Sequence, residues 1–300
     1  MKRFVRKPLI RRVLPPLIPG ILLLFGMIPA YPMDWPSQNA QLVRNFGWND
    51  GGRPLLGNMF RGEGALRSAD LGELVFYHAS SNTASTLPSP LGSWAALEHG
   101  DGIIGIYSRF EDRQAPAFSA VIEKDTVIAS MGISGWSSQE GYYFSLFDRR
   151  ERRWVNPSAL ISSLADTRPP QIHSVRLRNS RDLTIDPAQT RTIRQDRYTI
   201  LVNASDTRLN PNESPLAPYR ILCSVNGVEI GALSFETFST RDGVLMIYRN
   251  GLVPVKEIYG PDPDYEIGEV EFSRGQAAVE VIAQDMAGNT RSVLYRFQVE

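Results

Sequence analysis

The sequence predicts an all-β protein. Short runs rich in β-branched and aromatic residues recur along its 300 residues, and clusters of Gly, Ser and Pro bound them. No apolar repeat at helical spacing continues for any length through residues 51–164. The dipeptides Asp101-Gly102 and Asn226-Gly227 each separate two such runs, which is a strong hairpin signal. The length allows two β domains, each with its own core.

The first thirty residues are typical of an export signal. Six basic residues and no acid precede an apolar run, Leu17–Ala30, that ends on a small residue. The run is short for a membrane span, which needs about 20 apolar residues. We expect export to a periplasm-like compartment or cell envelope after cleavage at Ala30, with an uncleaved inner-membrane anchor as the alternative. The single cysteine, Cys223, allows no disulfide within the chain.

A polar, extended lead-in is expected at residues 31–50, followed by a compact β domain at residues 51–164. Its strands are expected to be brief and bounded by turn residues. They are Glu73–His78, Ser93–His99, Ile103–Ser108, Thr126–Ser130 and Tyr142–Phe147.

A second β domain is expected at residues 172–300, after a polar linker at residues 165–171 that contains a proline pair. About seven short strands with turn signals between them predict an antiparallel sandwich of immunoglobulin type. The expected strands are Ile172–Leu177, Tyr198–Ala204, Tyr219–Val225, Val228–Leu233, Val244–Tyr248, Ala278–Gln284 and Val293–Val299.

Several segments of the first domain follow one another in a recognisable order. A His-x-Gly-x-Asp motif would fall at Phe60-Arg-Gly-Glu-Gly64, and a Tyr-x-His-Leu motif would fall at Ile106-Tyr-Ser-Arg-Phe110. A His-x-His-Phe motif would fall at Gly141-Tyr-Tyr-Phe144, and a closing Asn-Pro is present in Val155-Asn-Pro157. Together with the glycines between them, these segments resemble the LytM/lysostaphin-type zinc endopeptidases, which cut peptide cross-links in bacterial cell walls.

The resemblance places the three zinc ligands at Phe60, Gly64 and Tyr143, and the two auxiliary histidines at Arg109 and Gly141. A catalytic zinc needs three donor side chains, which Phe and Gly cannot supply. The chain has three histidines, and no His-x-x-x-Asp or His-x-His occurs around His78, His99 or His173. The resemblance therefore implies a degenerate member that is not an enzyme and holds no metal or cofactor. The alternative is a metal recruited by carboxylates such as Glu63, Asp70 or Asp101.

The class of function that remains is binding, through the cleft that holds the catalytic site in the zinc endopeptidases (the old cleft). The candidate residues are Arg61, Glu63, His99, Arg109, Trp136 and Tyr143. Arg109 is expected either to pair with Glu63 or to bind a peptide carboxylate. Trp136 is a candidate for an exposed contact, and His99 is expected in a strand-end turn, with a residual ligand contact as the alternative.

The acidic loops Asp206–Glu213 and Asp262–Glu266 are expected to be solvated turns, with calcium binding as the alternative.

The zero net charge gives no field for nucleic acid. Through the resemblance, we expect a non-catalytic envelope protein that binds peptidoglycan peptide or regulates a cell-wall hydrolase. A divergent active endopeptidase with another metal site and a purely structural envelope module remain as alternatives. The sequence leaves undecided whether the cleft is open or filled by the lead-in around residues 39–49.

Overall fold

The computed structural model describes residues 33–80, 89–111, 121–162, 164–260 and 262–300. These residues form strands, loops and three short 3-10 helices, at Gly100–Gly102, Pro157–Ala159 and Val255–Glu257, so the all-β prediction is confirmed. The predicted signal segment lies outside the described residues. Within those ranges, no helix is long and apolar enough to cross a membrane.

The N-terminal β region, residues 33–162, is built on an antiparallel sheet in the order β10-β9-β6-β5-β4-β7. β2 pairs with the first half of β9 and β10 with the second half, and β3 pairs with β8 in a small separate sheet. The strands of this region are β1 (Gln41–Arg44), β2 (Asn58–Arg61), β3 (Ala65–Arg67), β4 (Gly72–His78), β5 (Ser93–His99), β6 (Ile103–Phe110), β7 (Val121–Ile122), β8 (Val127–Ser130), β9 (Gly141–Asp148) and β10 (Arg153–Val155).

The predicted hairpin at Asp101-Gly102 joins β5 to β6. In the three-residue connection Gly100–Gly102, Asp101 has a φ of 62° and Gly102 a φ of 78°, positive angles that Asp and Gly tolerate in tight turns. Asn226 and Gly227 repeat this pattern with φ of 52° and 80°. Both turns follow from local backbone chemistry, which is why the sequence predicts them.

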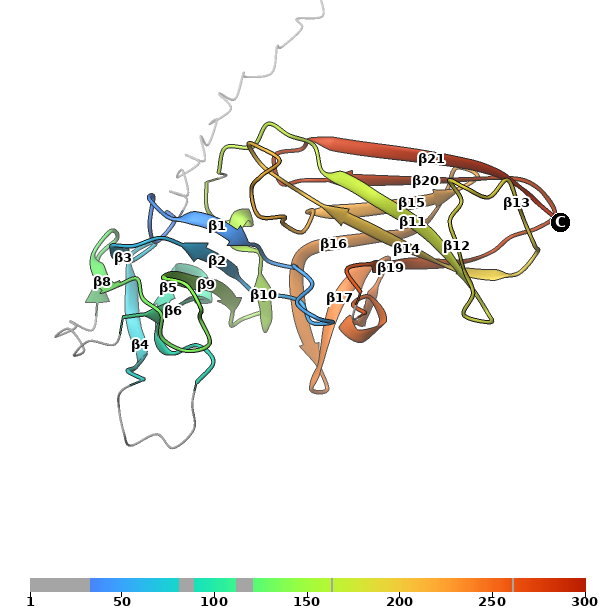
Figure 1. The fold of residues 1–300 in the computed structure, drawn as a ribbon. Helices are drawn as coiled ribbons and strands as arrows, with labels where there is room; N and C mark the ends of the chain where they lie inside the picture. Colours follow the sequence, from blue (N-terminus) through green and yellow to red (C-terminus); the bar gives the residue numbers. More distant parts are fainter. Residues whose placement is uncertain (1–32, 81–88, 112–120, 163, 261) are drawn as a thin grey trace, which may run out of the picture. The chain divides into compact units, whose positions relative to one another are not determined.

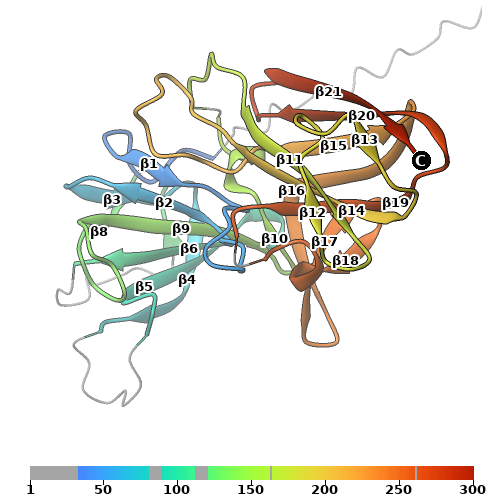
Figure 2. The same ribbon diagram turned by 45° about the vertical axis from the view of Figure 1, so that its right-hand side comes forward.

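The C-terminal β region, residues 164–300, has two sheets around one core. One has the order β12-β11-β14-β19, and the other contains β21, β20, β15, β16 and β17 (Figures 1 and 2). Alternate residues such as Ile200 and Val202 of β14 and Val279 and Val281 of β20 are buried in a common cluster. The strands are β11 (Gln171–Asn179), β12 (Thr184–Ile185), β13 (Thr192–Ile193), β14 (Arg197–Ser205), β15 (Arg220–Val225), β16 (Val228–Arg241), β17 (Val244–Arg249), β18 (Leu252–Pro254), β19 (Tyr265–Glu271), β20 (Gly275–Gln284) and β21 (Thr290–Val299).

Four strands of this region, β12, β13, β18 and β19, are missing from the sequence-based prediction, and β19 is the longest of them. β19 begins at Tyr265, inside the stretch expected to be the acidic loop Asp262–Glu266. Tyr265 is 2% exposed, and Asp264 is buried and forms an ion pair with Arg176 of β11. The expectation of a solvated turn is therefore wrong for the second half of that loop.

The two regions share hydrogen-bonded strands. β10 pairs with β16, with Trp154 opposite Phe238. Each region nevertheless has its own buried apolar cluster. The predicted domain boundary at residues 165–171 stays a prediction.

Candidate functional site

The pairing register of β2 with β9 determines which side chains lie on the same face as Tyr143, where the resemblance places the zinc site. Phe60 lies opposite Tyr142, and Met59 lies opposite Tyr143. Side chains directly opposite one another lie on the same face of a sheet. The Phe60 and Tyr142 rings stack in the core, with centroids 4.6 Å apart and planes 6° apart. Phe60 therefore points away from Tyr143, and the residue that faces Tyr143 is Met59, which the sequence alignment passes over.

Arg109 reaches this face because of a bulge. The pairing of β5 with β6 shifts between Ser93 and Trp94, and Arg109 adopts a φ of 67°. Its guanidinium carbon lies 5.6 Å from the centre of the Tyr143 ring, and its Nη1 lies 3.5 Å from the Met59 sulfur. The expected partner, Glu63, forms no ion pair with Arg109 among the described residues.

The Met59–Arg109–Tyr143 cluster, defined by these three residues, is partly buried: Tyr143 is buried, and Met59 and Arg109 are half-buried. Burial lowers the pKa of Arg109, while Tyr143 and the charge of Asp50 act in the opposite direction. Burial also raises the pKa of Tyr143, which is 8% exposed. Its ring lies against Gly57, where an added Cβ would come within 2.8 Å of the ring carbon that bears the hydroxyl. The segment that ends at Gly57 therefore packs against the Tyr143 ring.

Gly141 has no space for a side chain. A Cβ at this position would lie 2.0 Å from the carbonyl oxygen of Phe60 on β2. Gly141 also exchanges two backbone hydrogen bonds with Gly132, of 3.0 and 3.1 Å. The backbone therefore has no room for the auxiliary histidine that the resemblance places here. At Gly64 the space is open, but a φ of 105° disfavours any side chain.

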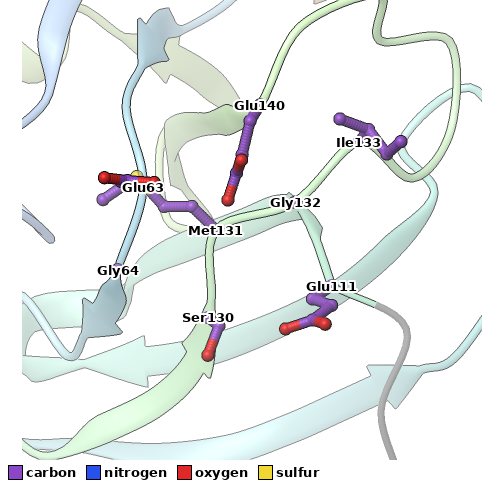
Figure 3. Close-up of a pocket in the computed structure, with 8 residues that line it drawn as sticks. All are labelled: Glu63, Gly64, Glu111, Ser130, Met131, Gly132, Ile133 and Glu140. Carbon is purple, nitrogen blue, oxygen red and sulfur yellow. The ribbon is translucent and has the colours of Figure 1, made fainter.

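An open groove of about 780 Å³ lies beside the Met59–Arg109–Tyr143 cluster. It is formed where β2, β6, β8 and β9 begin or end, and backbone hydrogen bonds such as Met131 N–H to Gly64 (2.8 Å) and Glu111 N–H to Ser130 (2.9 Å) hold its walls. Its lining residues are Glu63, Gly64, Glu111, Ser130, Met131, Gly132, Ile133 and Glu140. Figure 3 shows Glu63 and Glu140 on one side of the Met131–Gly132 segment, with Glu111 and Ser130 on the other.

The remaining candidates lie outside the groove lining. Trp136 is 74% exposed on the loop between β8 and β9, and its backbone N–H donates to Pro90 (3.3 Å). The Ser134 hydroxyl of the same loop donates to the Phe110 carbonyl at 2.6 Å, which anchors the loop. Arg61 is exposed and donates to the Gln41 side chain at 2.8 Å.

His99 is a buried residue at the end of β5. Its Nδ1 lies 3.0 Å from the Leu71 carbonyl, so this nitrogen carries the proton. Its Nε2 lies 3.1 Å from the Tyr107 hydroxyl, which accepts from the Ala69 N–H and donates to the imidazole. Burial lowers the pKa of His99 against smaller opposing effects from Leu71 and Asp70. Both ring nitrogens are thus used within the fold.

The carboxylates proposed as replacement metal ligands are not brought together. Asp101 lies in the β5–β6 turn, 3.4 Å from Arg150, near the end of β9. Glu63 lies near the start of β9, because the adjacent Gly62 N–H donates to Glu140. The length of β9 separates them by about 23 Å at a rise of ~3.3 Å per residue.

Three residues at the site were not selected by the sequence analysis. Met59 lies in the Met59–Arg109–Tyr143 cluster, and Glu111 and Glu140 line the groove. The alternation along β2 could have pointed to Met59, but only with the register known. Among the described residues, the carboxylates that do converge within 4.8 Å are those of Asp166, Asp206 and Asp285.

Comparisons with known proteins add the following. A family model matches residues 169–300, and no curated protein matches the sequence. The catalytic domain of the prophage-encoded M23 protein EnpA from Enterococcus faecalis matches at 17% identity and a TM-score of 0.35, over 42% of this chain and 95% of that one.

A zinc-containing peptidase from Vibrio cholerae matches at 16% identity and a TM-score of 0.33, over 42% of this chain and 39% of that one. Lysostaphin from Staphylococcus simulans matches at 15% identity and a TM-score of 0.31, over 84% of this chain and 86% of that one. The chain is thus similar, at low identity, to solved structures that include M23 peptidases.

Proposed function

We propose that this chain is a non-catalytic cell-envelope protein whose N-terminal β region binds a peptide that carries a free amine, such as a peptide of the bacterial cell wall. The resemblance of its motifs to cell-wall endopeptidases suggests the ligand class. The observation that carries the proposal is the groove at the ends of β2, β6, β8 and β9, whose lining includes Glu63 and Glu140 and, among the residues that the structure describes, no lysine or arginine.

The chemistry of the groove suits a cationic ligand. An alkyl amine is protonated at neutral pH and is attracted to carboxylates. The side chain of Ile133, which is 66% exposed, adds apolar surface beside the glutamates. A peptide with an amine and short aliphatic side chains would meet both kinds of surface.

The neighbouring positions support binding over cleavage. Met59 and Tyr143 lie opposite each other, and a side chain at Gly141 would collide with the Phe60 carbonyl. The positions that the resemblance assigns to zinc ligands thus offer no imidazole and no carboxylate. In this proposal Arg109 is a structural cation that holds Tyr143, not a ligand contact.

The test is binding of purified cell-wall peptides to the full chain, measured by calorimetry. We expect binding that weakens when salt rises from 50 to 500 mM, because charge attraction is screened. Acetylation of the peptide amine should remove it. The double variant Glu63→Gln/Glu140→Gln should weaken binding at least tenfold, whereas Glu229→Gln, an exposed glutamate of β16, should leave it unchanged.

Three outcomes would contradict the proposal. Cleavage of wall peptides that stops on chelation would indicate the divergent endopeptidase. Binding that is equal in the wild type and the double variant would place the ligand on another surface. The absence of any binding to wall peptides would favour a structural envelope module.

A further inference from the structure

A second set of carboxylates lies apart from the groove. Asp166 precedes β11, Asp206 follows β14, and Asp285 follows β20. One carboxylate oxygen from each lies within 4.8 Å of the others. Three separate segments of the chain therefore bring like charges to one point, in a small cavity of about 50 Å³.

Asp206 is the least satisfied member of this set. It is 5% exposed, and its Oδ1 has no hydrogen-bond partner in the part of the chain that the structure describes. In contrast, both oxygens of Asp285 accept from Asn289, from its backbone and its side-chain nitrogen, at 2.8 Å each. Asp166 accepts from the Arg168 N–H at 3.1 Å. A buried carboxylate oxygen without a partner costs free energy unless a ligand satisfies it.

The surroundings do not neutralise the three charges. Arg208 lines the same cavity and its charge acts on Asp166 and Asp206, but it forms no ion pair with them among the described residues. The three carboxylates thus share a small cavity without an ion-pair partner among the described residues, and a bound cation would offset their repulsion.

We propose that Asp166, Asp206 and Asp285 form a calcium-binding site. Calcium binds oxygen ligands at about 2.3–2.6 Å, so ligand atoms on opposite sides of the ion are separated by about 4.8 Å. Oxygens that all lie within 4.8 Å of one another can therefore contact one such ion. Magnesium usually keeps several waters and binds through one or two carboxylates, so three converging carboxylates favour calcium. Backbone carbonyls and water would supply the remaining ligands.

The site would join segments that the fold otherwise holds weakly. Thr167, next to Asp166, donates its N–H to the Arg208 carbonyl at 3.2 Å. Asp206 exchanges backbone hydrogen bonds of 2.8 and 3.0 Å with Leu216, which belongs to the apolar cluster of the N-terminal β region. A bound ion would fasten the segment before β11 to the ends of β14 and β20. From the sequence, Asp206–Glu213 is expected to be a solvated turn, with calcium binding as the alternative. In the proposed site, Asp206 is the one residue of that loop that would bind the ion.

The experiment is calcium titration of the full chain after chelator treatment and dialysis, followed by calorimetry and by thermal unfolding. We expect one calcium ion, with a dissociation constant of about 10⁻⁴–10⁻³ M as in extracellular modules. At calcium 100 times this value the unfolding midpoint should rise by several degrees. Asp206→Asn and Asp166→Asn should each weaken binding at least tenfold, and Asp262→Asn, an exposed acid of the other acidic loop, should not.

Four results would overturn the proposal. They are no calcium binding at up to ~10 mM, equal binding by Asp206→Asn and the wild type, loss of binding in Asp262→Asn, and an equal midpoint shift with magnesium or with sodium chloride of matched ionic strength. If Asp206→Asn does not fold, Asp166→Asn gives the same comparison, because Asp166 is only half-buried. None of these results bears on peptide binding in the groove.

Discussion

Replacement of Gly141 by alanine tests whether this backbone has room for the side chain that an active member would need. The new Cβ would lie 2.0 Å from the Phe60 carbonyl oxygen and 2.9 Å from its carbon. An ordinary contact between these atoms is more than an ångström longer, so β2 and β9 must separate at their first pair. Overpacking of this kind costs about 1–3 kcal/mol. Disturbance of the adjoining Gly132–Gly141 hydrogen bonds adds about 1 kcal/mol.

We therefore expect Gly141→Ala to lower the free energy of unfolding by about 3 kcal/mol, measured by urea denaturation of the full chain. Gly100→Ala is the matched control, because a Cβ there meets nothing within 4 Å and its φ is not positive. It should change stability by about 0.5 kcal/mol or less. Equal stability of the two variants would refute the reasoning and would mean that the site can accept a histidine.

Three other predictions follow from buried groups. Phe60→Ala should lower the free energy of unfolding by about 3–5 kcal/mol, because the ring is stacked in the core; a loss below ~1 kcal/mol in urea denaturation would contradict this. Burial lowers the pKa of His99, so the contribution of His99 to the free energy of unfolding is present above pH 6.5 and is lost as the pH falls. His99→Gln should therefore flatten the acid limb of a curve of stability against pH. Burial raises the pKa of Asp206 from 3.8 to about 7, so calcium-free protein should lose stability as the pH rises through this interval; Asp206→Asn should lack that loss, and an unchanged curve would argue against it.

Much of the N-terminal β region could be predicted because its signals are local. Ser93–His99 forms β5 as expected, and β4, β6, β8 and β9 differ from the expected ranges by one or two residues. The β19 strand was missed because Asp262 and Asp264 dominate its start. Their polarity predicts a loop, while the ion pair of Asp264 with Arg176 is a tertiary contact.

The site was predicted less well, for reasons of register and distance along the chain. Arg109 and Tyr143 do lie together, but Arg109 contacts Met59 where the sequence suggested Glu63. A bulge of one residue turns a side chain to the other face of a sheet, and no composition reveals it. His99 looks like a site residue in sequence, yet its two ring nitrogens bond within the fold.

Neighbouring residues and composition suffice to predict the all-β class, the hairpins at Asp101-Gly102 and Asn226-Gly227, and the lack of any His-x-His or His-x-x-x-Asp pair among the three histidines. These are properties of neighbouring residues or of composition. Only the tertiary structure decided that Met59 and not Phe60 faces Tyr143, and that Asp166, Asp206 and Asp285 converge. Strand register depends on the partner strand, and charges from distant segments meet only when burial of the apolar clusters outweighs their repulsion.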